Sequence, residues 1–295
     1  MPEFLHGTII KGVGGLYSVQ TECGLFECKA RGLFRIKDQT PLVGERVTLS
    51  VVDGQKREGY LHEIHERKNS LLRPKVVNVD QTVIVFAIVR PLINLEFLDK
   101  LLIHSEMREL PIVICLNKTD LDDGLEYEQI AADYRLAGYQ VVCVSAVKNS
   151  GIDELMALLE GKISVLTGPS GVGKSSIINA LRRDDTVETG ELSEKIDRGR
   201  HTTRHTELMP LSYNTFIIDT PGFTSLELPR IRKLDLPDYY PEFKPFIGGC
   251  YFGNCLHVSE PDCAVKAEIG KEFPRGRYER YCGFSEQLKM DLEKY

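Results

Sequence analysis

The segment GPSGVGKSS at residues 168–176 constrains the fold of this chain more than any other feature of its sequence. It fits the pattern G-x-x-x-x-G-K-[ST], follows the apolar run KISVLTG and precedes the helical pattern KSSIINALRR. Glycines let backbone N–H groups curl around phosphates, and the following helix presents its N-terminus to the anion. The segment therefore predicts a phosphate-binding loop in a parallel α/β sheet; an incidental glycine-rich turn is the alternative.

Each residue of this loop has an expected role. Lys174 should reach the β- and γ-phosphates and take part in catalysis, and the Ser175 hydroxyl should ligate Mg²⁺. The remaining nucleotide-binding residues of the loop are Gly168, Pro169, Ser170, Gly171, Val172, Gly173 and Ser176.

The segment FIIDTPGF at 216–223 is a second candidate element of the site. Asp219 ends an apolar strand, and a carboxylate there suits an Mg²⁺ held through its hydration shell. The Gly222 N–H would sense the γ-phosphate. Alone, D-x-P-G indicates only a turn, but after a phosphate loop it indicates a nucleotide site.

The segment NKTD at 117–120 has the composition of a guanine reader. Asp120 would accept two hydrogen bonds from the guanine N1–H and N2 amine, a donor pair that adenine lacks. Lys118 would lie along the base and ribose, Asn117 would tie the loop to neighbouring segments, and Thr119 completes the set.

Ser145 and Ala146 end the next apolar strand and would offer a backbone N–H to the guanine O6. Taken alone, each of these short matches fits a solvated loop equally well. Both follow apolar strands, however, and they occur in the mutual order that a guanine site requires. Their placement favours a nucleotide site.

The order of these elements along the chain is unusual, because the guanine reader precedes the phosphate loop. A GTPase domain gives this order when its original ends are joined and its chain is opened at a surface connection. The sequence therefore predicts a circularly permuted GTPase domain. The segment after DTPG then leads directly to the C-terminal region, so GTP and GDP are expected to change the pose of that region.

Three regions of the chain differ in their predicted pattern of strands and helices. Residues 1–70 read as about five short strands with glycine-bearing turns, which favours an oligonucleotide/oligosaccharide-binding (OB) barrel over an SH3-like or other small barrel. Residues 71–230 alternate strand and helix, which predicts a parallel sheet covered on both faces. Residues 231–295 carry no strong strand and are expected to form a small helical domain held by a metal.

Four soft ligands fall within a short stretch near the C-terminus. The spacing Cys250-x4-Cys255-x-His257-x5-Cys263 suits one tetrahedral Zn²⁺, closed and structural. Scattered buried cysteines beside a surface histidine are the alternative, and Cys282 is a possible substitute ligand. The other cysteines are expected to pack in the barrel and the sheet: Cys23, Cys28, Cys115 and Cys143.

No apolar run approaches the roughly 20 residues of a membrane helix, and the first residues lack the pattern of a secretory signal. We therefore expect a cytoplasmic protein with no membrane partner. The net charge of −6 is carried by residues 71–230, so any nucleic-acid contact must be a local patch. RGLFRIK at 31–37 and KEFPRGRYERY at 271–281 interleave basic and aromatic residues, as RNA-binding surfaces and ordinary solvated faces both do.

The chain resembles the RsgA (YjeQ/YloQ-type) family of small-ribosomal-subunit biogenesis GTPases. The resemblance rests on RPKVVNVDQ, NKTD, GPSGVGKSS, GRHTTRHTEL, DTPGF and the Cys/His cluster, in family order over nearly the whole chain. It implies an OB barrel, a permuted GTPase core and a zinc domain. It also implies that the protein, expected to be a monomer, binds the 30S subunit and its 16S rRNA late in maturation, with GTP hydrolysis stimulated by that subunit.

The resemblance also implies how water is activated. Many GTPases orient the attacking water with a glutamine after D-x-x-G, but here Phe223 follows the glycine. The family's substitute matches His201, whose neutral imidazole could orient or deprotonate water; a solvated loop histidine is the alternative. Thr203, or Thr202 beside it, matches the switch threonine that ligates Mg²⁺. Arg204 replaces a threonine that is common in the family, and it could instead touch RNA phosphate.

Three other readings remain open at the level of sequence. A signalling or metabolic GTPase would use its end domains to bind a protein. A non-enzymatic RNA-binding module would show negligible turnover even with ribosomes. An ATPase is disfavoured by Asp120.

Overall fold

A computed structural model describes residues 3–30, 40–72, 74–182, 206–222 and 225–288 of the chain. The chain divides into two compact units. One contains Met1–Gln81, Met156–Leu166 and Ile177–Thr220, and the other contains Thr82–Leu155, Thr167–Ser176 and Pro221–Tyr295. Within the described ranges, no helix has the length and apolar character needed to cross a membrane.

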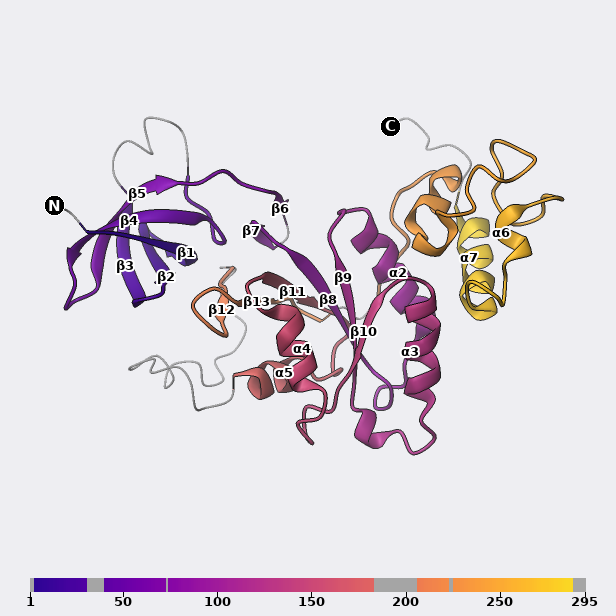
Figure 1. Ribbon diagram of the computed structural model, residues 1–295, viewed down its shortest axis with the longest axis horizontal. Coiled ribbons are helices and arrows are strands. Elements are labelled where there is room, and N and C mark those ends of the chain that lie inside the picture. Colours follow the sequence, from indigo (N-terminus) through magenta and orange to yellow (C-terminus); the bar gives the residue numbers. More distant parts are fainter. Residues whose placement is uncertain (1–2, 31–39, 73, 183–205, 223–224, 289–295) are drawn as a thin grey trace. The chain divides into compact units, whose positions relative to one another are not determined.

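The N-terminal strands close into the expected five-stranded barrel in the order β1-β2-β3-β5-β4 (Figure 1). Neighbouring strands are antiparallel except for the parallel pair β3–β5. The bounds are β1 Phe4–Val13, β2 Leu16–Thr21, β3 Gly24–Ala30, β4 Arg46–Asp53 and β5 Glu58–Ile64. Alternating apolar side chains fill the interior: Ile9, Val19, Phe26, Cys28, Val47, Leu49 and Leu61.

One of the two cysteines expected to pack inside the barrel does not. Cys28 is fully buried as predicted, but Cys23 is exposed. Cys23 belongs to the turn between β2 and β3, where its backbone N–H is bonded to the Thr21 hydroxyl at 3.1 Å. A side chain in such a turn points away from the barrel interior, so the prediction for Cys23 was wrong.

A short hairpin follows the barrel, formed by β6 Ser70–Leu72 and β7 Lys75–Val77. Asn78, just after it, bonds the Gly44 carbonyl at 2.9 Å and the Lys68 amide at 2.8 Å. Gly44 has φ of +91°, and a Cβ there would lie 2.1 Å from the Val77 carbonyl. The close approach of these two backbones therefore requires glycine at position 44.

The central sheet has six strands in the order β10-β9-β8-β11-β13-β12. The parallel pairs β8–β9, β9–β10 and β11–β13 confirm the predicted parallel sheet, and the short β12 pairs antiparallel with β13. The bounds are β8 Gln81–Ala87, β9 Ile112–Asn117, β10 Gln140–Cys143, β11 Ile163–Thr167, β12 Met209–Pro210 and β13 Phe216–Asp219. Every residue of β8 and β11 is buried, which agrees with their mostly apolar composition.

Helices connect these strands in the predicted alternation: α2 Leu95–Glu106, α3 Glu126–Leu136, α4 Ile152–Leu159 and α5 Lys174–Leu181. α2 begins where the Asn94 side chain accepts the Phe97 backbone N–H at 2.9 Å, a capping bond that satisfies a free donor of the first turn. Its buried face carries Leu98, Leu101 and Leu102 against β8 and β9.

The described C-terminal residues form short helices, as predicted. They comprise η3 Lys233–Tyr239, η4 Pro241–Phe243, α6 Ala264–Ala267 and α7 Arg275–Gln287. Aromatic side chains dominate their core: Tyr240, Phe243, Phe273, Tyr281 and Phe284, with Ile103 of α2 in the same cluster. The C-terminal region therefore packs on α2.

Candidate nucleotide and metal sites

The phosphate loop joins β11 to α5, as the sequence predicts. Gly168 has φ of +146°, and a Cβ there would lie 2.1 Å from the Val85 carbonyl of β8. Lys174, the first residue of α5, is buried, and its amine donates to the carbonyls of Gly168 and Pro169, each at 3.0 Å. The loop thus folds around the lysine amine, with its backbone at the N-terminus of a helix.

Asn117 links three segments of the site. It ends β9 and is almost fully buried. Its Nδ2 donates to the Val172 carbonyl at 2.9 Å, and its Oδ1 accepts the Ala146 N–H at 3.3 Å. A Cβ at Gly173, where φ is +93°, would lie 2.4 Å from that Nδ2. The expected tie between the guanine reader and neighbouring segments is present, and the structure identifies these segments as the phosphate loop and Ala146.

Lys118 holds the reader against the phosphate loop. Its backbone is in the left-handed region with φ of 64°. Its amine donates to the Gly171 carbonyl at 2.7 Å and to the carbonyl of Arg90, in the loop between β8 and α2. The next residue, Thr119, bonds the Val144 carbonyl through its N–H at 3.3 Å and its hydroxyl at 3.2 Å. The sequence did not predict the contact with Arg90, because any residue type supplies a backbone carbonyl.

The Asp120 carboxylate is oriented by a neighbour. The Ser145 hydroxyl donates to Asp120 Oδ1 at 2.5 Å and accepts the Lys148 N–H at 3.1 Å. Ser145 is nearly fully buried, and its backbone exchanges two hydrogen bonds with Ser150 at 3.0 and 3.1 Å. The sequence predicted a backbone role for Ser145 and Ala146; the hydroxyl contact to Asp120 adds a side-chain role.

Gly222 lies against the phosphate loop. A Cβ at this position would be 2.9 Å from Ser170 N and 3.2 Å from Lys174 Nζ, so only glycine fits. Asp219 ends β13 with an exposed side chain, and the Thr220 hydroxyl beside it donates to the Leu166 carbonyl at 2.8 Å.

The candidate water-activating and switch residues fall outside the part of the chain that the structure describes. These are His201, Thr202, Thr203, Arg204 and Phe223. The same holds for the basic and aromatic segment at 31–37.

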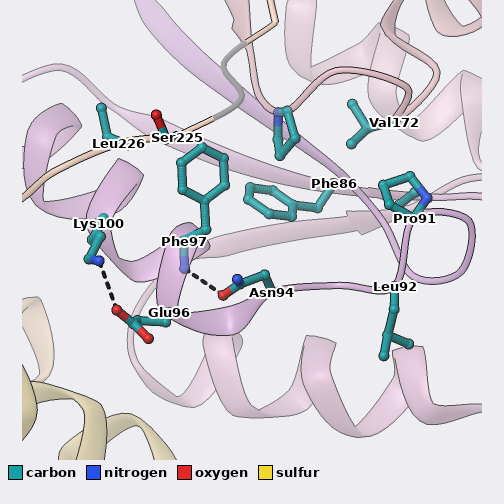
Figure 2. A pocket seen from close by; sticks show the side chains of 12 residues that line it. Phe86, Pro91, Leu92, Asn94, Glu96, Phe97, Lys100, Val172, Ser225 and Leu226 are labelled. Atoms are coloured by element: carbon teal, nitrogen blue, oxygen red, sulfur yellow. Dashed lines mark hydrogen bonds and ion pairs between the residues drawn. The ribbon is translucent and has the colours of Figure 1, made fainter.

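A cavity of about 380 Å³ lies beside the phosphate loop (Figure 2). Phe86 and Phe97 form its apolar wall, and the Glu96–Lys100 ion pair at 2.7 Å lies at one side. Its lining includes Pro169 and Val172 of the loop but none of Lys118, Asp120 or Lys174. The nucleotide site is therefore defined by the converging motifs and not by this cavity.

The four predicted metal ligands converge. The ligand atoms of Cys250, Cys255, His257 and Cys263 all lie within 4.8 Å of one another. His257 Nδ1 is 3.5 Å from Cys250 Sγ and 3.3 Å from Cys263 Sγ, so Nδ1 faces the centre of the cluster. Burial lowers the pKa of His257, which favours the neutral imidazole that coordinates a metal.

Backbone donors also support thiolates here. The His257 N–H points to Cys255 Sγ and the Lys266 N–H to Cys263 Sγ, both at 3.4 Å. The predicted substitute, Cys282, does not belong to this ligand group. Three sulfurs and one imidazole fit a closed tetrahedral site for a soft divalent metal.

The basic helix α7 turns largely inward. Arg277 is buried and donates to Asp99 Oδ1 of α2 at 2.5 Å, to the Glu242 carboxylate, and to the Tyr139 hydroxyl at 3.2 Å. Arg280 donates to the other Asp99 oxygen at 2.5 Å. The segment at 271–281 was expected to be either an RNA-binding surface or a solvated face. Two of its three arginines, Arg277 and Arg280, are committed to buried and half-buried ion pairs, whereas Lys271 and Arg275 are exposed.

A parallel sheet with a phosphate loop and a guanine reader, in reversed chain order, defines a circularly permuted P-loop GTPase. Family models describe the chain in the same terms: the RsgA GTPase model matches residues 64–229, and the RsgA N-terminal domain model matches residues 6–61. The chain belongs to the RsgA GTPase family and is a GTPase, which confirms the resemblance drawn from its motifs.

Similar proteins cover nearly the whole chain. The "Small ribosomal subunit biogenesis GTPase RsgA" of Caldanaerobacter subterraneus subsp. tengcongensis is 46% identical over 288 residues, 97% of each chain. The protein of the same name from Geobacillus kaustophilus is 44% identical over 294 residues, 98% of this chain and 99% of its own.

Two solved structures share the whole architecture. YjeQ from Thermotoga maritima aligns with a TM-score of 0.76 at 33% identity, covering 97% of this chain and 99% of that one. YloQ, described as a circularly permuted GTPase, aligns with a TM-score of 0.77 at 35% identity, covering 99% and 98%.

Proposed function

We propose that this chain is a GTP-hydrolysing factor that binds the small (30S) ribosomal subunit late in maturation and leaves after hydrolysis. The single observation that carries the nucleotide part is the Ser145–Asp120 contact at 2.5 Å. It restricts the Asp120 carboxylate, which in this proposal accepts the donor pair of guanine. The names of the 44–46% identical relatives support the ribosomal part.

The described residues divide the work of binding. Asp120 accepts the donor pair of guanine. Lys118 lies along the base, and its amine donates to the Gly171 carbonyl of the phosphate loop. Ala146 offers its N–H to the guanine O6. Lys174 and the loop backbone neutralise the phosphates, and Ser175 and Asp219 serve Mg²⁺, directly and through water respectively. In this proposal Thr203 adds a second Mg²⁺ ligand in the GTP state, with Thr202 as the alternative.

Hydrolysis needs a water in line with the γ-phosphate. Phe223 offers no polar group at the position where a glutamine would act, so His201 is proposed to orient the water. The geometry of Gly222 against Ser170 and Lys174 supports a sensor of the γ-phosphate beside this water.

The end domains serve docking. The barrel and the C-terminal domain are proposed to contact 16S rRNA, with one Zn²⁺ held by Cys250, Cys255, His257 and Cys263 as a structural element. The proposed domain boundaries are 1–70, 71–230 and 231–295, and the working form is a cytoplasmic monomer.

Co-sedimentation tests this function. The purified protein is mixed with 30S subunits in a non-hydrolysable GTP analogue, in GDP or without nucleotide, with 50S subunits as the control. Retention on 30S that is strong only with the analogue supports the proposal. Equal retention in all three states, or none on 30S, would favour a GTPase whose partner is a protein.

A further inference from the structure

The chain that follows the candidate switch residues is attached to the N-terminal barrel. Glu207 Oε2 lies 3.0 Å from Lys11 Nζ of β1. The Leu208 N–H donates to the Ile10 carbonyl of the same strand at 2.9 Å, and the Leu208 side chain is almost fully buried. Both sides of this contact belong to the same compact unit of the chain.

A β-bulge in β1 makes the attachment possible. Ile9 pairs with Val19 of β2 and Lys11 pairs with Ser18, so Ile10 has no partner in that register. The pairing of β1 with β4 also leaves Ile10 out. Because a bulge disrupts the ladder locally and redirects its backbone groups, the Ile10 carbonyl is free to accept a bond from chain outside the barrel.

The residues that come next are held by the central sheet. Met209 and Pro210 form β12, which pairs with β13. The Leu211 N–H donates to the Thr215 carbonyl at 2.8 Å. Residues 207–211 therefore form a strap that joins barrel strand β1 to the edge strand of the sheet. Since the strap is bonded on both sides, the barrel helps to set its position.

The strap lies close in sequence to the candidate switch residues. Thr203 precedes Glu207 by four residues, and His201 precedes it by six. A link of four residues spans at most about 14 Å when it is fully extended. Ligation of Mg²⁺ and in-line attack by water both tolerate little displacement of the groups involved. A strap that loses its hold on the barrel should therefore slow hydrolysis.

The ion pair of the strap has no evident structural purpose. Both side chains are 43% exposed, so the pair of Lys11 with Glu207 contributes little to the stability of the fold. The hydroxyl of Ser18, opposite Lys11 on β2, donates to the carboxylate of Glu27 at 2.7 Å. Glu207 is thus the acidic partner of Lys11 among the described residues.

We propose that Lys11 and Glu207 are positioning residues for GTP hydrolysis. Together with the backbone bond beside them, they hold the end of the switch segment on the barrel, so that this segment reaches Mg²⁺ and the attacking water. The inference rests on the proposed function, which places Thr203 and His201 at the nucleotide. It gives the barrel a second role besides docking, because a ligand that shifts β1 would change the rate of hydrolysis.

The test is a double-mutant cycle on GTP hydrolysis by the full-length protein without ribosomes. Lys11→Met and Glu207→Gln should each lower kcat roughly fivefold, the upper range for one exposed ion pair. The double variant should also fall roughly fivefold, and not roughly 25-fold, because both changes remove the same contact. Lys11→Arg keeps the ion pair and should turn over like the wild type. The matched control is Lys56→Met, which removes the exposed barrel pair with Asp53 at 4.0 Å.

The affinity for GDP separates positioning from a general structural role. The switch residues act in the GTP state, so all variants should bind a fluorescent GDP analogue, and melt, like the wild type. Equal losses of kcat and of GDP affinity would overturn the proposal, because they indicate damage to the whole nucleotide site. Wild-type kcat in both single variants, or a double variant that falls by the product of the two single effects, would also overturn it.

Failure of the proposed function would give a different result. Single-turnover reactions with excess protein measure slow basal rates, so the cycle needs no ribosomal component. If 30S subunits do not bind or stimulate the wild-type protein, the ribosomal function fails. The pattern of basal kcat values in the four proteins of the cycle then still supports or overturns the positioning role.

Discussion

The Arg277 guanidinium on α7 donates to the Asp99 carboxylate on α2 at 2.5 Å, joining positions 178 residues apart in the chain. Asp99 is fully buried and also accepts from Arg280 at 2.5 Å and from the Tyr134 hydroxyl at 2.7 Å. Buried charges persist only when they are paired and hydrogen-bonded. This network therefore fixes α7 to α2, the helix that follows β8. A nucleotide-dependent change in the pose of the C-terminal region relative to α2 would have to break these ion pairs.

Removing the Asp99 carboxylate should strongly lower the stability of the fold. Asp99→Ala removes the buried carboxylate that two arginines share, leaving Arg277 with Glu242 alone and Arg280 without an acidic partner among the described residues, and we expect a loss of about 3–5 kcal/mol in the free energy of unfolding. Urea denaturation followed by tyrosine fluorescence measures this loss. The matched control is Glu96→Gln on the same helix, which breaks the partly exposed pair with Lys100 and should cost less than about 1 kcal/mol. Equal effects of the two variants would show that the buried network is not a main anchor.

The Ser145 hydroxyl should matter for nucleotide affinity. Ser145→Ala removes a hydrogen bond to a carboxylate, an interaction of about 1.5–3 kcal/mol, so GTP should bind roughly 10- to 100-fold more weakly. Titration with a fluorescent GTP analogue measures the affinity, and Ser150→Ala, whose contacts to residue 145 are through the backbone, is the control. Wild-type affinity in the Ser145 variant would show that Asp120 needs no orienting partner.

The Asp120 side chain should decide the choice of base. Asp120→Asn presents an amide donor where guanine also donates, so preference should shift toward xanthosine triphosphate, which offers an acceptor there. The ratio of the two dissociation constants measures the shift. An unchanged preference for GTP would remove the assignment of residues 117–120 as the guanine reader.

Substituting a metal ligand and substituting the nearby Cys282 should have different effects on metal content. One zinc per chain is expected by atomic absorption, and Cys263→Ser should lower both the zinc content and the melting temperature. Cys282→Ala should retain the metal, because Cys282 is outside the ligand group. Loss of zinc in the Cys282 variant would make this residue a ligand.

The two barrel cysteines should differ in reactivity. Burial raises the pKa of the Cys28 thiol to about 12, so at pH 8 almost none of it is thiolate, whereas the side chain of Cys23 is exposed. Brief alkylation at pH 8 followed by peptide mass spectrometry should label Cys23 and spare Cys28 until urea is added. Equal labelling in the native protein would contradict the barrel packing.

The sequence predicted much of the nucleotide site, because each of its motifs combines a fixed spacing with a strand or helix boundary. Lys174 begins the helix after the loop and Asn117 bonds the loop carbonyl of Val172, while their contacts with a nucleotide stay predictions. It could not predict that Arg277 and Arg280 face inward. An arginine beside tyrosines looks the same in an RNA-binding helix and in a buried network, and the deciding partner, Asp99, is remote in the chain. The Lys118–Arg90 contact was equally hidden, since it depends on a backbone carbonyl.

The measurement that tests the central claim most directly is steady-state GTP hydrolysis by the purified protein, alone and with 30S subunits, 50S subunits or 70S ribosomes. The account predicts slow turnover alone, a large stimulation by 30S subunits and little by 50S subunits, with the stimulation lost in His201→Ala. Turnover that stays slow in the presence of 30S subunits would contradict it, leaving a guanine-nucleotide site whose activating partner is not the small subunit.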